Sequence, residues 1–224
     1  MASARRRLSP EERRAELLAL GAEVFGKRPY DEVRIDEIAE RAGVSRALMY
    51  HYFPDKRAFF AAVVKDEADR LYQATNKEPI NGLTMFEEAR VGVLAYMAYH
   101  DQNPEAAWAA YVDMGNTDPV LLGITEEAKT RQLENIMTRI GEVVAGVQEA
   151  KLKPDVERDL RVIIHGWIAF TFEVCRQRII DPTTDAERLA DACAHTLLDS
   201  IARVPEIPET LAHAMATARY APQQ

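Results

Sequence analysis

Residues 36–53 constrain the fold of this 224-residue chain more than any other stretch, because they have the pattern of two short helices joined by a tight turn. Ile38 and Ala39 supply apolar positions on the first helix. Gly43 can adopt the positive φ angle that a tight turn requires, and Ser45 is a suitable N-cap for the second helix. The stretch therefore predicts a helix-turn-helix motif.

The second helix of this motif has one face for the core and one for the outside. Met49 and Phe53 are four residues apart, so they share a face and are expected to point into a core. The side chains left outside are those of Arg46, Ala47, Leu48, Tyr50 and His51. One guanidinium, one phenol, one imidazole and small apolar groups suit the major groove of DNA. We expect the first three residues to face base edges, and Tyr50, His51 and Lys56 to hold phosphates.

The motif and its flanks resemble the DNA-binding domain of the TetR family of bacterial transcriptional regulators over residues 12–62. The positions that carry the resemblance are Leu17, Leu18, Phe25, Tyr30, Ile38, Ala39, Gly43, Val44, Ser45, Tyr50, Tyr52, Phe53, Pro54 and Lys56. The resemblance implies a three-helix DNA-binding domain followed by a helical domain. We count Ser45 among the DNA contacts as well.

Two positions depart from the family pattern. The glycine that usually ends the first helix is replaced by Pro29, which must end it by lacking an N–H and by restricting Arg28. The Ser or Thr that usually caps the next helix and touches a phosphate is replaced by Arg34. A cap is lost there, but the longer cationic side chain could reach the same phosphate, so Arg34 joins the predicted DNA contacts.

Helical spacing and cap residues recur along the whole chain, and no segment has the alternation of a strand. The expected helices cover residues 10–26, 35–42, 45–52, 55–75, 84–101, 104–115, 118–149, 155–180, 185–203 and 208–219. The helix breakers at 76–82 separate a DNA-binding domain, residues 9–56 with a linking helix over 55–75, from a ligand-binding and dimerisation domain, residues 76–220. The predicted fold is all-α, with an N-terminal three-helix helix-turn-helix domain and a C-terminal helical bundle.

The net charge of −8 at first argues against a nucleic-acid partner, but residues 1–56 carry 11 Lys or Arg and 10 Asp or Glu, so all of the excess acid lies beyond residue 56. An acidic C-terminal part can direct DNA towards a basic N-terminal face. Arg5, Arg6 and Arg7 are either an ordered arm that enters the minor groove or a disordered, solubilising terminus. The sequence has neither a membrane-spanning apolar run nor a secretory signal, so we expect a cytoplasmic protein without a membrane partner.

Catalytic and metal-binding signatures are absent from the sequence. It has no dinucleotide-binding glycine pattern, no nucleophile elbow and no zinc-protease motif. Its five histidines and two cysteines lack the spacing of metal ligands. We therefore expect no enzymatic activity, no metal and no cofactor.

Aromatic and methionine side chains are concentrated in the C-terminal part, where they could line an adaptable apolar cavity. The candidate lining residues are Met97, Trp108, Tyr111, Trp167 and Phe170, with His165 and Thr171 as polar groups that orient a ligand. For any single one of these residues, ordinary core packing is the simpler alternative.

The last two long helices are apolar on more than one side, which indicates a second partner. On the expected helix over 185–203, the residues at four-residue steps are Leu189, Cys193, Leu197 and Ile201. The family resemblance implies that this helix and the one before it pair with a second copy as a four-helix bundle. The alternative is that these residues are buried within one chain.

Together these patterns predict a homodimeric repressor that binds a pseudo-palindromic operator in double-stranded DNA and is released by a small apolar effector. The alternative from another class is a constitutive nucleoid-type DNA-binding protein with no effector. An enzyme with a helix-turn-helix appendage would need a catalytic constellation, which the sequence lacks.

Overall fold

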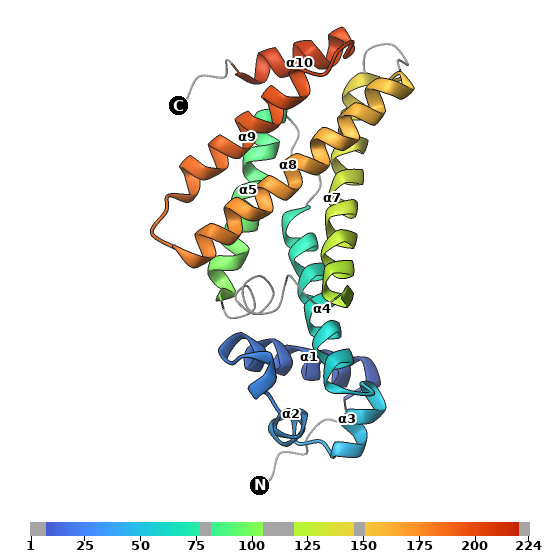
Figure 1. Ribbon diagram of the computed structural model, residues 1–224, viewed down its shortest axis with the longest axis vertical. Coiled ribbons are helices and arrows are strands. Elements are labelled where there is room, and N and C mark those ends of the chain that lie inside the picture. The colour runs from blue at the N-terminus through green and yellow to red at the C-terminus, as the bar shows by residue number, and fades with distance from the viewer. Residues whose placement is uncertain (1–7, 77–81, 105–118, 146–150, 220–224) are drawn as a thin grey trace. The chain divides into compact units, whose positions relative to one another are not determined.

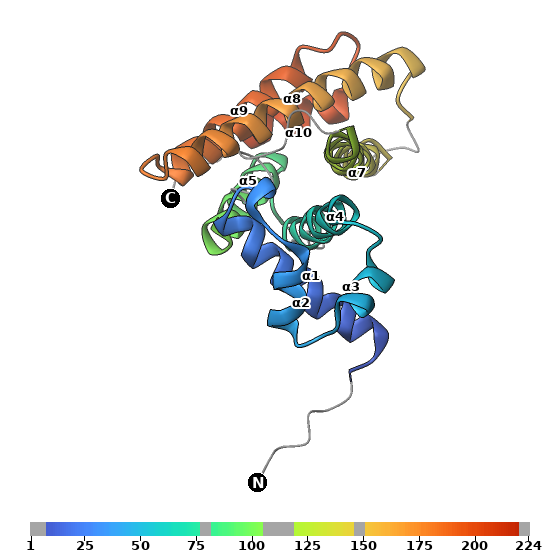
Figure 2. The same ribbon diagram turned by 60° about the horizontal axis from the view of Figure 1, so that its bottom comes forward.

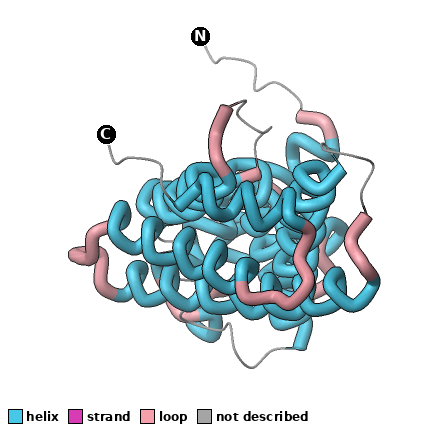
Figure 3. Tube along the Cα trace, turned by 90° about the horizontal axis from the view of Figure 1, so that it is seen from above, coloured by secondary structure: helices cyan, strands magenta, loops and turns pink. Residues whose placement is uncertain are grey.

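The computed structural model describes residues 8–76, 82–104, 119–145 and 151–219, and all regular structure in these ranges is helical, without a strand (Figures 1 and 3). The elements are α1 (Pro10–Lys27), η1 (Tyr30–Glu32), α2 (Ile35–Ala42), α3 (Arg46–Tyr52), α4 (Lys56–Thr75), α5 (Met85–Gln102), α7 (Pro119–Ala145), α8 (Pro154–Ile180), α9 (Ala186–Ala202) and α10 (Glu209–Arg219). The all-α prediction is confirmed. The helix expected over 104–115 lies outside the described residues, apart from its first position.

The chain divides into two compact units, and the division falls within α4 and α7. The first unit comprises Met1–Arg70 and Asn103–Ile124, and the second comprises Leu71–Gln102 and Thr125–Gln224. Among the described residues of both units, no helix is both long and apolar enough to cross a membrane.

The first unit is organised around a core to which α1, α2, α3 and α4 all contribute. Leu17 and Phe25 of α1, Ile38 of α2, Met49 of α3 and Phe59 of α4 are all buried in it. Within α1, α2 and α4 the buried residues recur at helical spacing, so each helix buries one side and leaves the opposite side in solvent. The core thereby fixes which side of α3 faces outward.

Helix α1 begins and ends where its sequence specifies. Ser9 and Glu12 form a capping box, in which the Ser9 hydroxyl accepts the Glu12 backbone N–H at 3.1 Å and the Glu12 carboxylate accepts the Ser9 backbone N–H at 2.7 Å. At the other end Arg28 is extended, with φ of −144° and ψ of 145°, as expected for a residue that precedes Pro29.

Close packing of α1 on α4 depends on Gly21. A Cβ atom at this position would lie 2.5 Å from Cζ of Phe59 and 2.6 Å from Cγ2 of Val63. Because real Cβ atoms do not approach other heavy atoms so closely, any larger residue would push α1 away from α4.

The second unit is a helical bundle in which α5 and α9 pack closely, with α8 and α10 against them. Figures 1 and 2 both show α8 and α9 running side by side. The Trp167 indole Nε1–H of α8 donates to the Cys193 carbonyl of α9 at 2.8 Å. Arg90 of α5 pairs with Asp191 of α9 at 2.6 Å. These contacts fix the order of the helices around a core that also takes side chains from α7.

Among the described residues, the polar side chain that is buried is that of His100, in the last turn of α5. It makes edge-on contacts with Tyr96 at 4.6 Å and Tyr99 at 5.9 Å between ring centroids. Burial lowers the pKa of the imidazole to about 4, and the nearby Asp101 carboxylate offsets this only in part. His100 is therefore neutral in the folded protein at neutral pH.

This lowered pKa predicts that acid destabilises the protein. In the unfolded chain His100 takes up a proton near pH 6.5, whereas in the folded chain it does so only near pH 4. Below pH 6.5 the unfolded state binds more protons, so the free energy of unfolding should fall, by about 2 kcal/mol at pH 5 from this residue. Urea unfolding at pH 8 and pH 5 measures the change. His100→Phe should reduce the pH dependence, and an equal dependence in both proteins would contradict the assignment.

Candidate nucleic-acid interface

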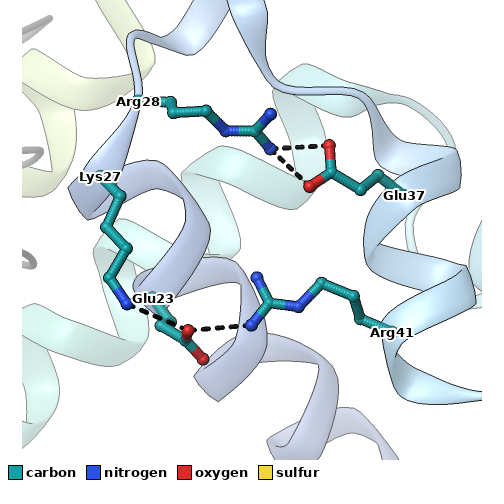
Figure 4. Close-up of polar contacts among 5 residues, drawn as sticks. All are labelled: Glu23, Lys27, Arg28, Glu37 and Arg41. Carbon is teal, nitrogen blue, oxygen red and sulfur yellow. Dashed lines mark hydrogen bonds and ion pairs between the residues drawn. The ribbon is translucent and has the colours of Figure 1, made fainter.

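Two ion pairs, Arg28–Glu37 and Glu23–Arg41, join α1 and its C-cap to α2, and a third, Lys27–Glu23, lies within α1 (Figure 4). The Arg28 guanidinium donates to both carboxylate oxygens of Glu37, at 2.8 and 2.7 Å. Glu23 accepts from Arg41 at 2.8 Å and from Lys27 at 3.1 Å, and these contacts lower the pKa of its carboxyl group, the Arg41 hydrogen bond most strongly. The three cations are thus used within the domain, which leaves DNA contacts to other basic residues.

The turn between α2 and α3 has the geometry that the sequence predicts. Gly43 is left-handed, with φ of 64° and ψ of 35°, and ends α2. Ser45 caps α3, because its hydroxyl accepts the Leu48 backbone N–H at 3.1 Å. Arg34 stands at the N-cap of α2 without a side-chain cap, so its side chain is free of that role and extends into solvent.

Helix α3 presents one face to the core and one to solvent. Met49 is fully buried at 0% exposure, and Phe53 just beyond the helix is buried as well. The exposed residues are Arg46, Ala47, Leu48 and His51, whereas Tyr50 is half-buried. The side chains that suit base edges therefore lie on the outer side of a short helix, and the core beneath them holds this helix in place.

Asp36, at the start of α2, is not among the site residues that the sequence predicts. Its Oδ2 lies 3.1 Å from Arg46 Nη1 and 4.0 Å from Arg34 Nη2. The Arg46 guanidinium carbon also lies 5.4 Å from the centroid of the Tyr50 ring. The two predicted DNA-contacting arginines thus share one carboxylate: Arg34 is its near neighbour in sequence, and the packing of α2 against α3 brings it to Arg46.

Lys56, the first residue of α4, is held beside η1. Its ammonium lies 4.3 Å from the centroid of the Tyr30 ring and 3.4 Å from the Asp31 carbonyl oxygen. A cation–π contact of this kind limits the positions of a long, flexible side chain. Arg5, Arg6 and Arg7, the predicted minor-groove arm, lie outside the described residues.

The predicted effector-contacting residues have different surroundings in the second unit. Met97 and Trp167 are buried in its core. Phe170 is exposed, and His165 Nε2 lies 3.8 Å from a Glu126 carboxylate oxygen. The Thr171 hydroxyl is screened from solvent. Trp108 and Tyr111 lie outside the described residues.

A pocket that the sequence reading did not foresee lies between α5 and α7. It has a volume of about 290 Å³ and is lined by Met85, Glu88, Arg139, Glu142 and Val143. Arg139 Nη1 pairs with Glu88 Oε2 at 3.1 Å, so the pocket has both apolar walls and a charged pair. Its volume is close to the lower limit for a small-molecule site.

The predicted dimer contacts on α9 are mostly inside one chain. Cys193, Leu197 and Ile201 are buried in the core of the second unit, and Leu189 is half-buried. Cys193, Leu197 and Ile201 therefore fit the alternative stated above, in which they are buried within one chain. The outward face of α8 is apolar instead, with Val162 69% and Phe170 43% exposed. Gly166 lies between them at four-residue spacing on the same helix face.

Comparisons with known proteins agree with this arrangement. Residues 17–63 match the family described as bacterial regulatory proteins, tetR family. The chain is 27% identical over 136 residues to the transcriptional activator FasR of Mycolicibacterium smegmatis, an alignment that covers 59% of this chain and 62% of FasR. It is also 27% identical over 162 residues to the transcriptional repressor KstR2 of the same species, covering 67% of this chain and 73% of KstR2.

A solved structure extends the likeness in fold to nearly the whole chain. The crystal structure of a tetR-family transcriptional regulator from Streptomyces coelicolor superposes with a TM-score of 0.73 at 20% identity. The match covers 95% of this chain and 90% of that one. The helical second unit, which the family model does not cover, therefore has the same fold as in that regulator.

Proposed function

Because the chain belongs to the TetR family of bacterial transcriptional regulators, which bind DNA and are not enzymes, we propose that it is a homodimeric repressor of a pseudo-palindromic operator. The observation that carries the proposal is the outer face of α3, where Arg46, Ala47 and Leu48 are exposed above the fully buried Met49. In this role Arg46 reads a base edge, while Arg34, Tyr50, His51 and Lys56 position the helix on phosphates.

The apolar outer face of α8 supports the dimerisation part of this proposal. Val162 and Phe170 expose apolar surface on either side of Gly166, whose missing side chain lets a second helix approach closely. Two copies of α8 with the adjacent α9 would form a four-helix bundle, and the twofold axis would place two α3 helices on successive major grooves. The contacts lie on this face rather than at Cys193, Leu197 and Ile201, which are already covered within one chain.

The effector proposal rests on the pocket between α5 and α7 and on the aromatic and methionine content of the second unit. An apolar molecule of moderate size that binds better to one form of the dimer would shift the population away from the DNA-binding form. A coupling of about 1–3 kcal/mol would change operator occupancy about 5- to 150-fold. Helix α4 is the element proposed to couple effector binding to DNA binding, because it runs without a break from Lys56 to Thr75.

Footprinting on the DNA upstream of the protein's own gene tests this function. We expect protection of a self-complementary site whose two halves are about 10 bp apart, centre to centre. A reporter under that promoter should rise when the protein is removed. A small-molecule screen should find compounds that quench tryptophan fluorescence and release the operator together. Binding without sequence preference, and unaffected by any ligand that the protein binds, would favour the nucleoid-type alternative.

A further inference from the structure

The guanidinium of Arg46 is held by groups from two helices. Asp36 of α2 places its Oδ2 3.1 Å from Nη1, and the guanidinium carbon lies over the Tyr50 ring of α3, 5.4 Å from its centroid. Tyr50 is one turn further along the same helix, so this contact follows from the helix itself. The contact with Asp36 depends on how α2 packs against α3.

This arrangement limits a side chain that would otherwise be mobile. Arg46 remains 68% exposed, and a long exposed arginine loses much conformational freedom when it binds in one orientation. With Nη1 directed to Asp36, the Nε–H and the Nη2 amino group remain as donors on the guanidinium. Parallel donors of this kind match the O6 and N7 acceptors of guanine.

The Asp36 carboxylate is partly shielded from solvent. Asp36 is the second residue of α2, its side chain is 29% exposed, and its Oδ1 is screened from solvent and makes no hydrogen bond to the described residues. Its Oδ2 atom lies 3.1 Å from Arg46 Nη1 and 4.0 Å from Arg34 Nη2, so Arg46 is the nearer of the two cations. A half-exposed ion pair contributes little to folding stability, so its main effect is on the orientation of the arginine.

We propose that Asp36 is a specificity-determining positioning residue, which holds the Arg46 guanidinium in the plane in which it reads a base pair. The inference rests on the proposed function, in which Arg46 faces base edges. It adds an opposing electrostatic effect, because the Asp36 carboxylate repels phosphates and lowers affinity for DNA of any sequence. Asp36 thus weakens binding in general and increases discrimination at one position.

Asp36→Asn separates these two effects, because it removes the charge and keeps the shape of the side chain. Base preferences are measured by selecting duplexes from a random library and then determining the affinities of the selected site, its single-base variants and unrelated DNA. We expect tighter binding to unrelated DNA. We also expect about a tenfold loss of preference at the base pair that Arg46 reads, with the other positions unchanged.

Glu40→Gln is the matched control, since it removes one negative charge from an exposed position on the same helix. It should change affinity for all duplexes alike and leave every base preference intact. Arg46→Ala should abolish the preference at the same base pair, and adding Asp36→Asn to it should cause no further loss there. Nuclear magnetic resonance of the Arg46 Nε–H in the DNA-free protein should show greater side-chain mobility in Asp36→Asn than in wild type.

The outcomes distinguish this inference from the proposed function. A wild-type chain that selects no sequence refutes the proposed function and this inference with it. If the wild type selects a site but Arg46→Ala keeps every base preference, Arg46 is not a reading residue and Asp36 has nothing to position. If Arg46→Ala loses one preference while Asp36→Asn retains it within about twofold of the Glu40→Gln control, only the role of Asp36 is overturned.

Discussion

Replacing Arg46 with alanine should weaken operator binding by roughly 1–3 kcal/mol and relax the base preference at one position in each half-site. The structure gives the reason, since Arg46 is exposed on α3 and oriented by Asp36 and Tyr50. Its removal costs no buried contact, so the folded protein should keep its stability. Affinities for the operator and for its single-base variants measure the effect. Unchanged operator affinity and unchanged preference would mean that a different face of the domain reads DNA.

Lys56→Ala is the comparison for this variant, because Lys56 is assigned to a phosphate rather than to a base. It should weaken binding to all duplexes alike, and the slope of log affinity against log salt should become shallower by about one. The Lys56 ammonium lies against the Tyr30 ring and near the Asp31 carbonyl, so its position at the start of α4 is defined. A loss of base preference in Lys56→Ala would reverse the two assignments.

The helix-turn-helix motif could be predicted from the sequence because its signals are local. Gly43 ends α2 in a left-handed conformation and Ser45 caps α3, and both effects involve only neighbouring backbone groups. The four-residue spacing of Met49 and Phe53 similarly predicted which face of α3 is buried. These signals do not depend on distant parts of the chain, so the expected and observed bounds of these helices agree within one residue.

The contact between Asp36 and Arg46 could not be predicted in the same way. The two residues are on different helices, and their distance depends on the angle at which α2 and α3 pack. An acidic residue in the first turn of a helix is already explained by its favourable interaction with the helix dipole. The sequence therefore gives no reason to expect that Asp36 also contacts Arg46. The same limit applies to the pocket between α5 and α7, whose lining comes from residues far apart in sequence.

The proposed dimer face shows why an apolar pattern alone is ambiguous. Helix α9 has its apolar stripe at Cys193, Leu197 and Ile201, and α5 and its neighbours cover that stripe within one chain. Helix α8 is apolar on both sides, so periodicity cannot tell which side meets its own core. The structure resolves this, with Ile164 fully buried and Val162 69% exposed two residues earlier.

Val162→Glu should therefore convert the dimer into a folded monomer and reduce operator affinity by about a hundredfold or more, because only one half-site is then bound at a time. In a twofold-symmetric interface the change introduces a carboxylate from each copy into the same apolar contact. Each charge would have to leave water without a partner, which costs far more than the interface gains from Val162. Because Val162 is mostly exposed in one chain, the fold itself should tolerate the change.

Val91→Glu is the matched control, since Val91 is also an exposed valine, 42% accessible, on α5 of the same unit. It makes the same chemical change away from the proposed interface, so that variant should remain a dimer with wild-type operator affinity. Sedimentation velocity without DNA measures the assembly state, and circular dichroism checks that both variants stay helical. If Val162→Glu sediments as a helical dimer, α8 does not form the interface. If it loses its helical signal, Val162 supports the fold and Phe170→Glu, on the same face, repeats the test.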